Sequence, residues 1–127
     1  MTRKVAVIGN ETFPLNVEIG TQVVDVLKSY GEDVVFLTRN AQGFEQFVAT
    51  AALALGRRCF TYPGRGSGDN LARDAELVAD ADEVVAFLNP ATLDNPRSGA
   101  ALVLDRALAA GKPVRAATTV HGMLVWA

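Results

Sequence analysis

The stretch Val5-Ala6-Val7-Ile8-Gly9-Asn10 decides the fold class of this chain. Its first four residues are all apolar, and a glycine ends the run. Such an unbroken apolar run is typical of a parallel strand that helices cover on both sides, because a half-exposed strand alternates apolar and polar residues. We therefore interpret residues 5–8 as a central parallel strand with Gly9 and Asn10 at its carboxyl end.

Similar apolar runs alternate with longer stretches that carry apolar residues at helical spacing. Strands are predicted at residues 34–37, 59–62, 84–88 and 114–117, and helices at about 16–30, 43–55, 70–81 and 98–110. No hairpin-type turn is recognised between two strands, and residues 120–126 are a candidate for one more short strand. This order predicts the α/β class, a Rossmann-like open parallel sheet of about five strands with helices on both faces. The 127 residues contain no linker, so a single domain over residues 1–127 is expected.

Composition and charge narrow the possible partners. Twelve basic and 14 acidic residues give a net charge of −2, which argues against nucleic acid as a partner. No run of about 18 apolar residues exists, so no membrane span is expected. The apolar run near the N-terminus is too short for a signal peptide, and a cytoplasmic location is therefore expected. His121 and Cys59 are the single residues of their kinds, and no metal site or cofactor is predicted.

Long polar loops leave the predicted strands, whereas the loops that enter them are short. The long loops are residues 9–16, 38–43, 63–70 and 89–99. In an open parallel sheet, ligands bind beyond the carboxyl ends of the strands. We therefore predict a ligand site at this edge of the sheet; the alternative is that the long loops are only tolerated insertions.

Three glycine-containing segments are candidates for contact with a ligand. Gly9 could allow close approach of a ligand to the backbone, or it could simply end the strand. Gly64 and Gly66 belong to a glycine-dense loop whose N–H groups could bind an anion before the next helix, or the loop could carry no ligand. Ser98 and Gly99 open the fourth predicted helix, where they could form a second anion site, or Ser98 could serve only as the N-cap.

The order of several degenerate motifs resembles the SLOG superfamily of Rossmann-type domains. Arg73-Asp74-x-x-Leu77-Val78, with the strand at 84–87, resembles the Arg-Asn-x-x-Met stretch and following strand of that superfamily. The segments at 39–45, at 98–99 and at 107–114 resemble its Gly-Gly-Ala-x-Gly-x-Asp turn, its Gly-Thr segment and its Gly-Lys-Pro-Val strand entry. The superfamily includes cytokinin-activating phosphoribohydrolases, the DNA-processing protein A domain and small phage proteins. Nucleoside 2-deoxyribosyltransferases share a similar last segment and are a close rival.

The resemblance implies a binding site for a nucleotide or a nucleotide-derived small molecule. The residues that it places there are Gly9, Asn10, Arg39, Gly43, Gly64, Gly66, Arg73, Asp74, Asn89, Ser98 and Gly99. The catalytic glutamate of the resembling enzymes falls on Val103, whose side chain can neither attack nor accept a proton. We therefore predict binding without catalytic residues.

Two other functions stay open at this point. One is an N-glycosidic-bond hydrolase or transferase, of the phosphoribohydrolase or deoxyribosyltransferase type, that uses Asp74 or Asp105. The other is a phage-encoded protein-interaction module that acts on a host factor. A homo-oligomer is also expected, because the resembling proteins pair through helices and residues 100–104 are all apolar.

Overall fold

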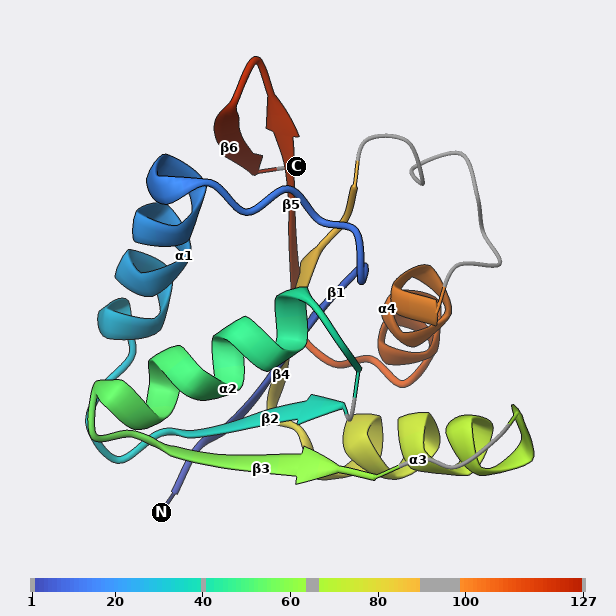
Figure 1. Ribbon diagram of the computed structural model, residues 1–127. Helices are drawn as coiled ribbons and strands as arrows, with labels where there is room; N and C mark the ends of the chain where they lie inside the picture. Colours follow the sequence, from blue (N-terminus) through green and yellow to red (C-terminus); the bar gives the residue numbers. More distant parts are fainter. Residues whose placement is uncertain (1, 40, 64–66, 90–98, 127) are drawn as a thin grey trace.

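A single twisted sheet runs through the molecule (Figure 1). The computed structural model describes residues 2–39, 41–63, 67–89 and 99–126, and for residues 67–70 it describes the backbone only. Within these ranges the strands are β1 (Lys4–Gly9), β2 (Val35–Arg39), β3 (Arg58–Tyr62), β4 (Glu83–Phe87), β5 (Val114–Val120) and β6 (Met123–Trp126). Their order is β3-β2-β1-β4-β5-β6, with β1 to β5 parallel and β6 antiparallel to β5.

Helices cover both faces of the sheet, so the predicted α/β, Rossmann-like class is confirmed. One face carries α1 (Val17–Ser29) and α2 (Phe44–Ala54), and the other carries α3 (Ser67–Asp80) and α4 (Gly99–Ala109) (Figure 1). In β1, Val5 and Val7 pack on the α1 and α2 side, while Ala6 and Ile8 pack on the α3 and α4 side. All four side chains are fully buried, which explains the unbroken apolar run.

The helices begin and end where the sequence provides capping residues. Asn16 is the N-cap of α1, and its side-chain oxygen accepts a hydrogen bond from the Ile19 N–H at 2.8 Å. Gly56 and Gly111 follow α2 and α4 with φ of 73° and 72°, a left-handed conformation that glycine adopts without strain. The predicted helix bounds agree with the structure to within about three residues.

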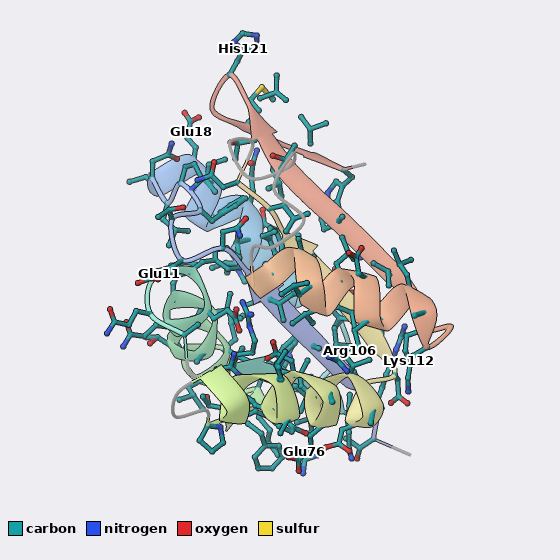
Figure 2. The ribbon with its side chains drawn as sticks, turned by 90° about the vertical axis from the view of Figure 1, so that its right-hand side faces the viewer. Glu11, Glu18, Glu76, Arg106, Lys112 and His121 are labelled. Atoms are coloured by element: carbon teal, nitrogen blue, oxygen red, sulfur yellow. The ribbon has the colours of Figure 1, made fainter. Side chains whose placement is uncertain are left out.

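The sequence analysis recognised no hairpin between strands, and this part of the predicted topology was wrong. β5 and β6 form an antiparallel hairpin in which Val120 pairs with Met123, so the described sheet has six strands instead of about five. His121 and Gly122 form the two-residue turn with φ of 51° and 75°. Positive φ at both central residues defines the type I′ turn, which usually carries Asn-Gly or Asp-Gly. The sequence pattern did not reveal this turn, because His121 is not one of the residues that usually precede the glycine. Figure 2 shows His121 at the tip of this hairpin, away from the body of the molecule.

A polar cluster around the buried residues Glu83 and Tyr30 lies at the opposite, amino-terminal edge of the sheet. Glu83, the first residue of β4, accepts hydrogen bonds from the Arg3 guanidinium and the Tyr30 hydroxyl, and Arg115 Nη1 donates to the Tyr30 oxygen at 3.3 Å. Burial, and then the adjacent Glu83, raise the pKa of Tyr30 to about 12. The cluster connects four separate segments of the chain, so we assign it a role in stability.

Candidate functional site

The carboxyl ends of the strands bring together most of the residues that the sequence predicts for a ligand site. Gly9 and Arg39 end β1 and β2, and Asn10 directly follows β1. Asn89 lies two residues after the end of β4, Gly43 precedes α2, and Gly99 begins α4. Arg73 and Asp74 lie in α3. Gly64, Gly66 and Ser98 lie outside the described residues.

A buried ion pair between Arg39 and Glu45 forms the centre of this edge. Oε1 of Glu45 accepts the Arg39 backbone N–H at 2.7 Å. Oε2 accepts the Gly9 N–H at 3.2 Å, Arg39 Nε at 2.8 Å and Arg39 Nη2. Arg39 Nη2 also donates to the Gly9 carbonyl oxygen at 3.2 Å. One carboxylate thus connects the ends of β1 and β2 to the first turn of α2.

The contacts of Glu45 are those of an ionised carboxylate, since every one of them comes from an N–H donor. Burial raises the pKa of the Glu45 carboxyl group, while the Arg39 guanidinium and the Arg39 and Gly9 N–H groups act in the opposite direction. Only 1% of Glu45 and 6% of Arg39 is exposed, so water contributes little to their solvation. Arg39 is therefore held in one orientation by a partner that is itself fixed.

The remaining terminal nitrogen of Arg39 lies beside the start of α4. A Cβ atom on Gly99 would lie 3.1 Å from Arg39 Nη1, so this nitrogen is close to the first residue of the helix. Within the described residues Nη1 donates no hydrogen bond. The amino terminus of a helix carries partial positive charge and N–H groups without intrahelical partners. A guanidinium beside it creates a place that favours an anion.

Two of the predicted glycines have structural explanations. A Cβ atom on Gly9 would lie 2.2 Å from Cδ2 of the buried Phe44 ring, so the glycine allows α2 to pack on the end of β1. Gly43 has φ of 79°, and a Cβ atom there would lie 2.3 Å from the Glu11 carbonyl oxygen. These contacts account for both glycines without a ligand at either position.

Hydrogen bonds join the two loops at the point where the strand order reverses. This point lies between β1 and β4, where open α/β sheets usually bind ligands. Asn10 Oδ1 accepts the Asn89 N–H at 2.7 Å, and Asn89 Nδ2 donates to the Thr12 carbonyl and hydroxyl oxygens at 2.9 and 3.1 Å. These bonds fix the relative position of the loops that follow β1 and β4. Asn10 and Asn89 thus have a demonstrated role in loop geometry.

A second buried arginine–carboxylate pair lies on the inner face of α3. Arg73 Nε donates to Asp74 Oδ1 at 2.9 Å, and both residues are less than 10% exposed. They precede Leu77 and Val78 of the core by one turn, so they lie towards the start of the helix and the carboxyl edge. Nη1 and Nη2 of Arg73 make no hydrogen bond within the described residues. These nitrogens are further donors for an anion.

Two positions of α4 bear on catalysis, and they differ in burial: Val103, where the resemblance expects a glutamate, and Asp105. Val103, at the position of the expected glutamate, is fully buried in the core between α4 and the sheet. Asp105 is exposed on the outer side of the helix, away from the core-facing residues. Asp74 is therefore the better placed of the two acidic residues for chemistry at the carboxyl edge.

Two hollows of the surface differ in size and in the character of their lining. A cavity of about 160 Å³ lies beside the ends of β2 and β3 and is lined by Arg39, Glu45, Thr38, Thr61, Ala41, Gln42, Gln46 and Ala49. A groove of about 660 Å³ lies between α1 and α2, where Leu15, Val17, Val24 and Phe47 give it a mainly apolar lining. The polar residues of the groove are spread along α1, whereas those of the cavity converge on an ion pair. Convergent polar groups mark a specific site better than volume does.

Glu45 is the functional residue that the sequence-based site prediction missed. It belongs to the segment 39–45 that carries the resemblance, but it was not predicted to contact anything. The signal was a single acidic residue among Phe44, Phe47, Val48 and Ala51 on the apolar face of its helix. An acidic residue on such a face requires a buried partner.

Comparison with protein-family models, with curated proteins and with solved structures finds no match to this chain. In the described ranges, no three histidine, cysteine, aspartate or glutamate residues are grouped so that they could hold a metal ion. None of the helices in the same ranges has the length and apolar character needed to span a membrane.

Proposed function

We propose that this protein binds a nucleotide or a nucleotide-derived small molecule, with a phosphate group between Arg39 and the amino terminus of α4. The observation that carries the proposal is the position of Arg39 Nη1 beside Gly99, while Glu45 holds the rest of the guanidinium. A phosphate oxygen there would accept hydrogen bonds from Nη1 and from the backbone N–H of Gly99, the first residue of the helix.

The polar cavity shares Arg39 with the proposed phosphate position but does not contain it, because no residue of α4 lines the cavity. The volume of this cavity, about 160 Å³, is below the roughly 300–1,000 Å³ of sites that enclose a drug-sized ligand. A nucleotide bound at this edge would thus be only partly enclosed. The sugar and the base would therefore extend along the carboxyl edge towards Arg73 and Asp74. The Asp74 carboxylate could accept hydrogen bonds from ribose hydroxyl groups.

The test is thermal unfolding in the presence of nucleotides, ADP-ribose-like compounds and cyclic dinucleotides at millimolar concentration. A ligand that binds only the folded protein raises the Tm. In a Gly99→Asp variant the new carboxylate would lie beside Nη1 and the helix terminus, so we expect it to occupy the position of the phosphate and to abolish the rise of the Tm with ligand. The matched control is Val17→Asp, at the exposed first position of α1, which should keep the response to ligand. If no compound stabilises the protein, or if Gly99→Asp responds as the wild type does, the proposal is wrong.

A second candidate function is cleavage or transfer at an N-glycosidic bond, and the buried position of Asp74 favours it. A carboxylate next to a guanidinium can stabilise or accept charge at a ribosyl centre. A nucleobase-release assay on nucleosides and nucleoside monophosphates tests this activity. Activity that is lost in Asp74→Asn and kept in Asp105→Asn would support an enzyme; release that is absent from the wild type would exclude it for these substrates.

A further inference from the structure

The two edge strands of the sheet, β6 and β3, differ in whether another element covers them. At the β6 edge, the Leu124 N–H donates to the side-chain oxygen of Gln22 on α1 at 3.1 Å, so a helix covers this strand. At the other edge, β3 pairs only with β2. In the described part of the chain, no hydrogen bond outside that pairing reaches the backbone of residues 58–62. An uncovered edge strand is a template for pairing with another strand.

The side chains of β3 make this edge apolar at its centre. Arg58, Phe60 and Tyr62 alternate along the strand and therefore lie on the same face. That face is the α3 side, because Tyr62 packs against the core of α3 and α4. Phe60 is 59% exposed although it lies in the middle of the strand. Monomeric proteins usually place a charge, a proline or a bulge at such a position.

Opposite charges lie at the two ends of β3. Arg57 and Arg58 are at its start. At its end the Tyr62 hydroxyl donates to Asp80 Oδ2 at 2.6 Å. Burial raises the pKa of Tyr62, and Asp80 and Glu76 add to the rise, which places both acidic groups near this tyrosine. Figure 2 shows Glu76 on the outer side of α3, and neither Glu76 nor Arg58 forms an ion pair within the described residues.

We propose that two copies of this chain pair through antiparallel β3 strands about a twofold axis, so that their sheets become continuous. With Phe60 opposite the partner's Phe60, Arg58 lies opposite the partner's Tyr62, beside the acidic groups Asp80 and Glu76. The basic end of each strand thus meets the acidic end of the other, and the two aromatic rings cover each other at the axis. Self-complementary charge of this kind is what a twofold interface between identical chains requires.

The apolar helix α4 is a weaker candidate for this contact. Ala100, Val103 and Ala107 are buried against the sheet, and Leu102 and Leu108 are exposed. At 100° per residue, Asp105 lies between these two leucines on the helix surface, so they form no continuous apolar stripe. The β3 edge therefore accounts better for the oligomer that the sequence led us to expect.

The test is the mass of the protein in solution, measured by sedimentation velocity and light scattering over a range of concentrations. The wild type should be a dimer, and Phe60→Lys, which places two lysines at the axis, should be a monomer with an unchanged circular dichroism spectrum. The matched control is Leu108→Lys, because Leu108 is 58% exposed on α4; this variant should remain a dimer. A monomeric wild type, or a Phe60→Lys variant that is still a dimer, would overturn the proposal.

A charge exchange tests the register of the two strands. Arg58→Glu should weaken the dimer by about tenfold or more, since it places a carboxylate beside the partner's Asp80 and Glu76. Adding Glu76→Arg to the same chain should restore much of the loss, because each new charge then meets its opposite. If Arg58→Glu dimerises as strongly as the wild type, this register is wrong. None of these variants alters Arg39, Glu45 or Gly99, so the outcome is independent of the ligand proposal.

Discussion

Removal of the negative charge of Glu45 is expected to cost the protein a large part of its stability. Glu45→Gln preserves the shape of the side chain but leaves the Arg39 guanidinium, only 6% exposed, without a counter-charge. Breaking a buried ion pair on one side typically costs about 3–5 kcal/mol. For a domain of this size, the corresponding fall in Tm is about 10–20 °C. Urea unfolding followed by circular dichroism gives the free energy of unfolding directly.

Glu18→Gln provides the matched control for this substitution. Glu18 and Glu45 are both the second residue of their helices, α1 and α2, but Glu18 is exposed on the outside of the molecule (Figure 2). Its substitution should change the free energy of unfolding by no more than about 1 kcal/mol. Adding Arg39→Met to Glu45→Gln should recover part of the loss, because the buried charge is then removed. A loss below about 1 kcal/mol for Glu45→Gln, or a double variant less stable than the single one, would refute the reasoning.

Three further outcomes are expected. Burial and Glu83 raise the pKa of Tyr30 to about 12, so the neutral hydroxyl contributes its full stabilisation below pH ~10, and this contribution is lost as the pH rises towards 12. Tyr30→Phe should remove this alkaline loss of stability, at most about 3 kcal/mol, as measured by urea unfolding across that pH range. Gly9→Ala should destabilise by about 1–3 kcal/mol through overlap with Phe44, and Phe44→Leu in the same chain should make the added Cβ less costly; equal costs in both backgrounds would contradict this. His121→Asn should raise stability by about 0.5–1 kcal/mol, because asparagine suits the left-handed turn better, and a lower Tm would argue against the type I′ assignment.

The parallel core could be predicted because its signal is local. Every residue of 5–8 is apolar, and the structure buries each of them, alternately on one face of the sheet and on the other. The β5–β6 hairpin could not be predicted in the same way. Its turn depends on positive φ at His121, and the backbone angle of a non-glycine residue is set by the pairing of the strands around it.

The sequence predicted where the candidate site lies in the fold, but it did not predict which residues contact one another there. Polar loops after the strands located the carboxyl edge, where Arg39 and Gly99 are now found side by side. The role of Glu45 depends on the Gly9 N–H at the end of β1 and on the N–H and guanidinium of Arg39 at the end of β2, so no spacing in the sequence encodes it. Likewise, the sequence offered close approach of a ligand or the end of a strand as reasons for Gly9, and it did not reveal that the Phe44 ring occupies the space of the missing side chain.

The central claim is that an anionic group binds between Arg39 and the start of α4, and a crystal structure of the protein with ADP-ribose tests it most directly. We expect a phosphate oxygen within hydrogen-bonding distance of Arg39 Nη1 and the backbone N–H of Gly99, with Glu45 still bound to Arg39. Density for the ligand in the groove between α1 and α2, or a phosphate that contacts neither Arg39 nor Gly99, would contradict the claim.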